Sequence, residues 1–298
     1  MTNYSRLKGI ACILLSALGF ALMNLSIPLS GDLPTVQKMF FRNLVAIGIA
    51  LFTLWESKKK TPHTKIKNVP WRILFLRSIL GTLGMGLNFY TLDRLLLADA
   101  SVLNKLAPFA TLIFSAVFLK EKMARPHLYA LALAFLGVLL ISKPTGAAAS
   151  LFPYLTGVVG GLCAGGAYTT VRYLNQLGVE PSLTVLFFSA FSCLACVPFM
   201  LFTYTPMPLR SLLMLLGTGL AASVGQFGVT YAYRFAPASE ISIFDYSSII
   251  FSGLLGFIFL QQVPDGGSFL GYLFIFLGAV LTFLYNRRQA RRARQEEV

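Results

Sequence analysis

Residues 98–122 read ADASVLNKLAPFATLIFSAVFLKEK, and residues 236–262 read APASEISIFDYSSIIFSGLLGFIFLQQ. Each block is followed by a short polar break and a second apolar run with a matched glycine, Gly137 in one copy and Gly278 in the other. The two copies align only with small gaps. The repeat unit contains an odd number of membrane spans, so we expect the second copy to lie upside down in the bilayer, as in many alternating-access transporters.

The composition identifies the bilayer as the solvent of this chain. Of its 298 residues, 56% are hydrophobic and only 12% are charged, and the mean hydropathy is +0.71. Soluble domains contain about 25% charged residues. The net charge is +14, but Lys and Arg gather in short loops and at the C-terminus, as orienting charges do. The basicity therefore does not indicate a nucleic-acid partner.

Ten apolar stretches are long enough to cross a membrane. Lipid offers backbone groups no hydrogen-bond partner, so we expect an all-α integral membrane protein with ten transmembrane helices in two inverted five-helix repeats. The repeats are expected at 1–145 and 150–286, followed by a basic cytoplasmic tail at 287–298. The stretches are 7–29, 35–55, 71–92, 97–119, 126–142, 151–174, 181–204, 209–233, 239–260 and 268–286.

The loop charges predict the orientation. With an inside N-terminus, most Lys and Arg residues of the loops and the tail fall on the cytoplasmic side, whereas Arg94, Lys143 and Arg210 fall outside. This asymmetry predicts a multi-pass protein of the cytoplasmic (inner) membrane with both termini in the cytoplasm.

The cysteines and histidines do not indicate a metal site. Cys193 and Cys196 form a CxxC pair, which can signal metal or redox chemistry. No second pair or histidine cluster accompanies it, and packing within apolar helices is the favoured interpretation. We expect no metal and no cofactor. No nucleotide-binding motif is evident, so ATP coupling within the chain is not expected either.

Several segments resemble a known family. FFRNLVA at Phe40–Ala46, ADASVLNKLAP followed by KEK, and DYSSIIFSGLLGFIFLQQVPD at 245–265 are similar to EamA-type members of the drug/metabolite transporter superfamily. The resemblance implies a ten-helix inverted-repeat transporter whose central cavity is lined mainly by spans 1, 3, 4, 6, 8 and 9. The family commonly has a glutamate near the end of the fourth span of each half. Glu121 fits this pattern, whereas Gln261 and Gln262 stand in the second half.

Charged residues inside spans are costly and are functional candidates by default. Arg42 and Arg77 qualify, although each can instead be a structural ion-pair partner or extend to the interface. Lys105 and Asp245 occupy similar levels of spans four and nine, so we expect a pair, with a structural and a substrate-binding role equally supported. Asp245 and Glu240 are the candidates for proton coupling, although Glu240 equally well complements the dipole of span nine.

Two further features concern span four and its flank. Pro108 cannot donate to the carbonyl of Asn104, so we expect a kink and a polar spot at membrane depth. A kink solvated by neighbouring helices is an equal alternative. Asp93 and Asp99 flank the loop before this span, and we expect both to be solvated.

Small residues recur every four positions on spans six and eight. Such stripes let helices approach closely in lipid; packing is the favoured interpretation, and a sliding face between transport states is the alternative. The positions are Gly157, Gly161 and Gly165 in span six, and Gly217, Ala221 and Gly225 in span eight.

We expect a secondary transporter, not an enzyme, that moves a small organic metabolite such as an amino acid by alternating access. Proton coupling and facilitated diffusion both remain open, as does a homodimer. A membrane-embedded lipid-modifying enzyme and a non-transporting scaffold are the alternatives. Aromatic walls with a few amides suit a small organic solute. The expected site residues are Asn24, Asn88, Tyr90, Asn104, Lys105, Tyr168, Gln226, Tyr231, Asp245 and Tyr246.

Overall fold

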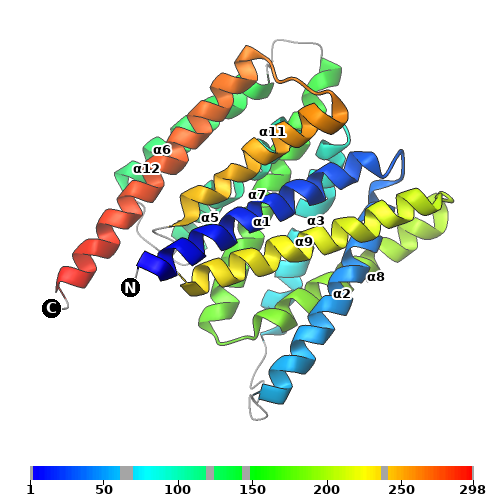
Figure 1. The fold of residues 1–298 in the computed structure, drawn as a ribbon, viewed down its shortest axis with the longest axis horizontal. Helices are drawn as coiled ribbons and strands as arrows, with labels where there is room; N and C mark the ends of the chain where they lie inside the picture. Colours follow the sequence, from blue (N-terminus) through cyan, green and yellow to red (C-terminus); the bar gives the residue numbers. More distant parts are fainter. Residues whose placement is uncertain (1–2, 61–69, 119–123, 143–147, 236–240, 297–298) are drawn as a thin grey trace.

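The computed structural model describes residues 3–60, 70–118, 124–142, 148–235 and 241–296. The regular elements in these ranges are all helical (Figure 1). The first half contains α1 (Asn3–Leu29), α2 (Thr35–Lys60), α3 (Trp71–Leu92), α4 (Leu97–Asn104), α5 (Ala107–Phe118) and α6 (Arg125–Ser142). The second half contains α7 (Ala148–Gln176), α8 (Pro181–Thr203), α9 (Leu209–Phe235), the 3-10 helix η1 (Ser242–Tyr246), α11 (Ser247–Leu260) and α12 (Gly266–Glu296).

Ten helical segments of the described chain are long and apolar enough to cross a membrane. Their bounds lie within a few residues of the stretches predicted from hydropathy, which confirms the predicted fold class of an all-helical, ten-span protein. Two spans are not single α-helices. The fourth is divided into α4 and α5, and the ninth begins with η1 before α11.

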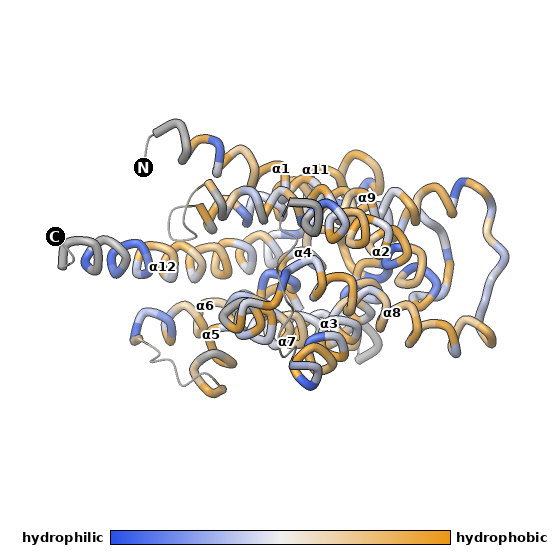
Figure 2. Tube along the Cα trace, turned by 90° about the horizontal axis from the view of Figure 1, so that it is seen from below, coloured by the Kyte–Doolittle hydropathy of each residue, from blue (hydrophilic) through white to orange (hydrophobic). Residues whose placement is uncertain are grey.

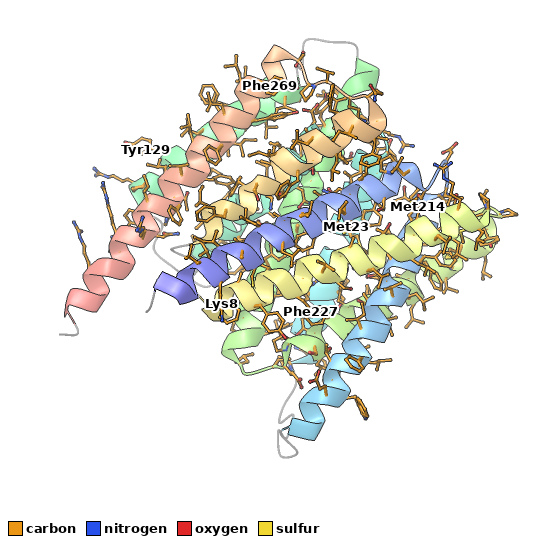
Figure 3. The ribbon with its side chains drawn as sticks, viewed as in Figure 1. Lys8, Met23, Tyr129, Met214, Phe227 and Phe269 are labelled. Carbon is orange, nitrogen blue, oxygen red and sulfur yellow. The ribbon has the colours of Figure 1, made fainter. Side chains whose placement is uncertain are left out.

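The outer surface of the bundle is apolar. Figure 2 shows hydrophobic residues along the helices and hydrophilic residues gathered at the ends, including the C-terminal end of α12. Large apolar side chains point away from the bundle, among them Tyr129 on α6 and Phe269 on α12, which are 65% and 57% exposed (Figure 3). In water such a surface would be unfavourable, whereas lipid chains solvate it at no cost.

Each span of the first half packs against a span of the second half. The first span (α1) lies along the eighth (α9), the third (α3) along the sixth (α7), and the second (α2) along the seventh (α8). The fifth (α6) packs along the tenth (α12) at one edge of the bundle, and the fourth (α4) contacts the ninth (α11) (Figure 1). Exchanging the two halves leaves this set of pairs unchanged. The halves therefore form one interleaved body.

The glycines of α7 bring this helix against the fourth span. A methyl group at Gly161 would lie 2.9 Å from the carbonyl oxygen of Leu103, and one at Gly165 would lie 2.4 Å from the Cβ of Ala110. A methyl group at Gly157 would meet the side chain of Leu103. Close approach of this kind requires small residues. In α9, by contrast, a methyl group at Gly217 would meet nothing within 4 Å, whereas Ala221 and Gly225 pack against Gly19, so the predicted stripe on span eight does not act as one face.

Candidate substrate site

The site lies where two spans are interrupted. Helix α4 ends at Asn104 and α5 begins at Ala107, so Lys105 and Leu106 separate them. Pro108 stands in the first turn of α5 and has no N–H to offer the carbonyl of Asn104. The predicted kink is therefore a complete break. Asp245 and Tyr246 lie in η1, which precedes α11 in the ninth span.

Lys105 and Asp245 meet at these two interruptions. The Nζ of Lys105 donates to Oδ2 of Asp245 at 2.5 Å, and the two side chains are 14% and 26% exposed. The same ammonium lies 5.9 Å from the ring centroid of Tyr246. Tyr246 is buried and contacts Phe276 of α12 edge-on. The predicted Lys105–Asp245 contact is present, and both partners retain accessible surface.

Tyr168 lies near Asp245 of this pair, and two arginines lie near Tyr168. Arg42 comes from α2, Arg77 from α3 and Tyr168 from α7. Tyr168 lies within electrostatic range of Asp245, Arg77 and Arg42, yet its side chain is 53% exposed. The guanidinium of Arg77 lies 4.3 Å from the ring centroid of Phe188 on α8. Five elements therefore contribute charged or hydroxyl groups to one region.

A second polar group links spans one, four and nine. The amide nitrogen of Asn24 donates to Oγ of Ser101 at 3.2 Å, and that hydroxyl donates to Oγ of Ser252 at 2.7 Å. All three side chains are buried. The side chain of Asn24 is therefore engaged in a hydrogen bond to Ser101 in this structure and does not line an open cavity.

The remaining predicted site residues occupy other places. Tyr90 stands in the last turn of α3, where Phe152 contacts its ring edge-on and Arg94 lies 3.7 Å from its centroid. Asn88 is buried on α3, and Asn104 is partly buried at the end of α4. Gln226 and Tyr231 are exposed on α9. Glu240 and Glu121 lie outside the described residues.

Asp93 and Asp99 are not solvated, so that expectation is wrong. Asp93 accepts a 2.7 Å hydrogen bond from the buried ammonium of Lys38, and burial raises the pKa of this carboxyl above its ordinary value although Lys38 opposes the shift. Asp99 is 1% exposed and accepts a 2.5 Å hydrogen bond from the hydroxyl of Tyr272. The burial of Asp99 could have been predicted from the sequence, because the residue lies within the apolar run of span four.

Polar contacts between helices gather at the end of the bundle that carries the turns after α1, α3, α8 and α11. Lys38 bridges the carbonyl of Ile27 and the carboxylate of Asp93. The side chain of Gln37 makes two hydrogen bonds with the backbone of Thr205. Together with the Asp99–Tyr272 bond, these contacts tie several spans together at that end.

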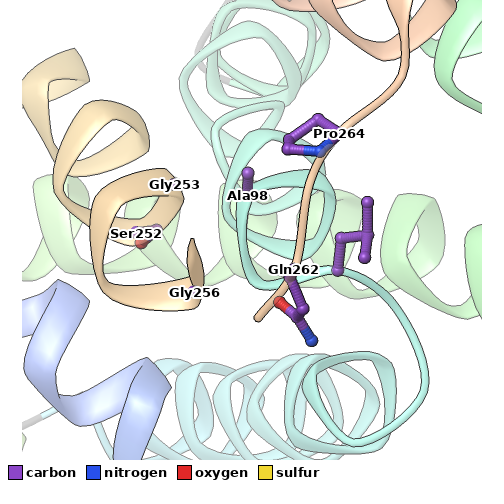
Figure 4. A pocket seen from close by; sticks show the side chains of 7 residues that line it. Ala98, Ser252, Gly253, Gly256, Gln262 and Pro264 are labelled. Atoms are coloured by element: carbon purple, nitrogen blue, oxygen red, sulfur yellow. The ribbon is translucent and has the colours of Figure 1, made fainter. Parts of the chain in front are cut away.

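A recess at this end does not have the size of a solute site. Figure 4 shows it between α4 and α11. Its empty space is about 140 Å³ and includes open solvent, whereas ligand pockets measure about 300–1,000 Å³. It is lined by Leu96, Ala98, Ser252, Gly253, Gly256, Gln262 and Pro264.

Within the described ranges, no group of three or more His, Cys, Asp or Glu residues is arranged to hold a metal ion. Cys193 and Cys196 are buried and free, one turn apart on α8. The thiol of Cys193 contacts the carbonyl oxygen of Phe40 at 3.6 Å. The CxxC pair thus packs α8 against α2.

Comparison with known proteins places the chain in a family. The model of the EamA-like transporter family matches residues 7–143 and again residues 151–284. The chain belongs to the EamA-like transporter family. The two matches divide the chain at residues 144–150, whose sequence is PTGAAAS.

Named relatives of this EamA-like protein are membrane transporters. The chain is 29% identical to the pseudopaline exporter of Pseudomonas aeruginosa over 275 residues, covering 92% of this chain and 95% of that protein. It is 24% identical to the riboflavin transporter of Vibrio cholerae over 300 residues, covering 97% of each. A solved crystal structure matches the fold with a TM-score of 0.66 at 17% identity, over 97% of this chain and 100% of that chain. The protein is thus a multi-span membrane transporter.

One departure from the EamA-type pattern has a structural role in this transporter. Gln261 adopts a left-handed conformation (φ 54°) that ends α11. The side-chain oxygen of Gln262 then accepts a 2.8 Å hydrogen bond from the backbone N–H of Leu97, at the start of α4. A neutral amide is sufficient for this contact because the donor is uncharged.

Proposed function

We propose that this protein is a secondary transporter that moves a small organic metabolite across the cytoplasmic membrane by alternating access between two inverted halves. The family and its named relatives support a transporter. The observation that carries the rest is the Lys105–Asp245 pair at the two interrupted spans. Discontinuous helices at the junction of two repeats are a common location of solute sites in secondary transporters.

The distribution of polar contacts supports alternating access. Lys38–Asp93, Gln37–Thr205, Leu97–Gln262 and Asp99–Tyr272 lie at the end that the loop charges assign to the outside. We infer a conformation that is closed on the outside.

Two mechanisms of transport fit this pair: coupling to a proton, and exchange or facilitated diffusion without a coupling ion. Asp245 accepts a hydrogen bond from the ammonium of Lys105. Proton coupling would require this contact to open during the cycle so that the carboxylate can take up a proton. Exchange or facilitated diffusion requires no such step.

Counterflow in proteoliposomes tests the proposal. Vesicles are loaded with an unlabelled metabolite at high concentration, and a trace of the same metabolite in labelled form is added outside. A transported metabolite should accumulate transiently inside, and the measurement is repeated with metabolites of other classes. Lys105→Ala and Asp245→Ala should abolish the signal, whereas Arg210→Gln, an exposed position at the start of α9, should retain it. Absence of counterflow over amino acids, organic acids, nucleosides and polyamines, together with turnover of labelled lipid by the same vesicles, would favour a lipid-modifying enzyme.

A further inference from the structure

Arg42 and Arg77 are cations at membrane depth without an acidic partner among the described residues. Neither forms an ion pair there. Nη1 of Arg42 donates to the side chain of Asn43 at 2.8 Å, but Nε of Arg42 is buried without a partner. Nε and Nη1 of Arg77 are likewise buried and have no hydrogen-bond partner. Three charged N–H positions are therefore unsatisfied.

The described part of the spans does not contain enough acid to neutralise both arginines. Its acidic residues are Glu56, Asp99 and Asp245, whereas Glu240, which the sequence places at the start of the ninth span, lies outside the described residues. Asp245 pairs with Lys105, Asp99 accepts from Tyr272, and Glu56 stands at the very end of the second span. Arginine does not lose its proton in proteins. The region around Tyr168 thus carries an excess of positive charge.

The packing around Arg77 maintains this arrangement. Its Nη1 lies over the backbone of Gly81, where a methyl group would approach it to 2.1 Å. The ring of Phe188 also packs on the guanidinium, with its centroid 4.3 Å away. Arg42 and Arg77 also lie within electrostatic range of each other, so they repel. A bundle that gained nothing from two unpaired cations would be more stable with neutral residues here.

We propose that Arg42 and Arg77 bind an anionic group of the transported solute, a carboxylate or a phosphate. This inference rests on the proposed transport function. A guanidinium fork matches both oxyanions with two parallel hydrogen bonds. The unpartnered nitrogens are buried in this conformation and are the donors that the anion would meet when the site opens, and the half-exposed Tyr168 beside them supplies a hydroxyl. The solute would thus be an organic anion whose charged group meets the arginines while its remainder reaches towards Lys105 and Asp245.

The first experiment needs no knowledge of the solute. The thermal unfolding midpoint of the purified, ligand-free protein is compared with those of Arg42→Gln and Arg77→Gln, with Arg72→Gln as the matched control because Arg72 is exposed at the start of α3. Removing an unpaired cation should leave the midpoint unchanged or raise it. A clear fall of the midpoint for both variants would identify structural ion pairs and overturn the inference. A lower midpoint for Glu240→Gln that is restored when Arg77→Gln is added would do the same.

The second experiment measures binding by thermal shift. The probes are citrate, glutamate and glucose 6-phosphate, with glutamine and glucose as neutral counterparts. Anions should stabilise the wild-type protein and Arg72→Gln, and each of Arg42→Gln and Arg77→Gln should weaken binding at least about tenfold. Stabilisation by citrate or glutamate would indicate a carboxylate site, and stabilisation by glucose 6-phosphate would indicate a phosphate site. Stabilisation by neutral probes only would overturn the inference, and if no probe binds, the ligand-free midpoints decide it.

The two proposals fail separately. If a neutral solute shows counterflow and this counterflow is unchanged in Arg42→Gln and Arg77→Gln, the transport proposal is retained and the anion site is excluded. Anion binding that depends on both arginines, without counterflow of any bound anion, would retain the site and exclude transport.

Discussion

The Nζ of Lys105 lies 2.5 Å from Oδ2 of Asp245, and this contact joins the fourth and ninth spans at the residues where both depart from a continuous α-helix. The break between α4 and α5 leaves the Asn104 carbonyl without its usual donor. The contact therefore joins the two halves through an ion pair at the two interrupted spans.

Exchanging the charges of this pair should preserve folding. Lys105→Asp alone places two carboxylates together and Asp245→Lys two ammonium groups, and each should lower the free energy of unfolding by about 3 kcal/mol, since one partner of a poorly solvated pair is lost. The double variant restores an attractive pair and should regain most of the unfolding midpoint. Two tolerated single variants combined with a double variant that does not fold would contradict a direct pairing.

The close approach of α7 to the fourth span should not tolerate a methyl group. Gly165→Ala would place Cβ 2.7 Å from the carbonyl oxygen of Ala107, in addition to its contact with Ala110. The backbone would have to shift to relieve this clash, so we expect Gly165→Ala to lower the free energy of unfolding by about 1–3 kcal/mol. Gly217→Ala is the matched control, since nothing lies within 4 Å of its Cβ. Equal midpoints for the two variants would show that α7 has room to move.

Asp93 should make stability depend on pH. Burial raises its pKa in the folded protein, so the folded state binds this proton more tightly than the unfolded state. The carboxyl therefore contributes most stability below its ordinary pKa of about 3.9, and the contribution is lost as the pH rises through the raised pKa. Relative to Asp93→Asn, which does not titrate, the unfolding midpoint of the wild type should fall as the pH is raised across the acidic range. A rise instead would mean that the attraction of Lys38 outweighs burial.

Tyr272→Phe should weaken the closed end of the bundle. The hydroxyl of Tyr272 donates to Asp99, which is 1% exposed, and a buried acceptor that loses its donor costs about 1–3 kcal/mol. If this contact holds the outer end together, Ser101→Cys in a cysteine-free background should react faster with an impermeant thiol reagent applied outside when Tyr272→Phe is added. Tyr129→Phe on the lipid-facing side of α6 is the control and should not change the rate.

The sequence predicted most of the fold for a simple physical reason. Apolar runs such as 7–29 and 181–204 must be helical in lipid, and their number, length and flanking charges follow from composition. The sequence also predicted the contact between Lys105 and Asp245, because a repeat alignment places them at similar levels. It did not identify Tyr272 as the partner of Asp99, because no repeat alignment places these two residues at the same level.

The sequence by itself therefore indicated the ten spans, a kink at Pro108 and the presence of charges at membrane depth. Tertiary structure alone decided which of the other charges are paired. Lys38 pairs with Asp93, whereas Arg42 and Arg77 lie within electrostatic range of Tyr168 and form no ion pair with an acid of the described chain. Pairing depends on which helix faces meet, and helix faces in lipid meet by the packing of small residues such as Gly161 and Gly165, which hydropathy does not encode.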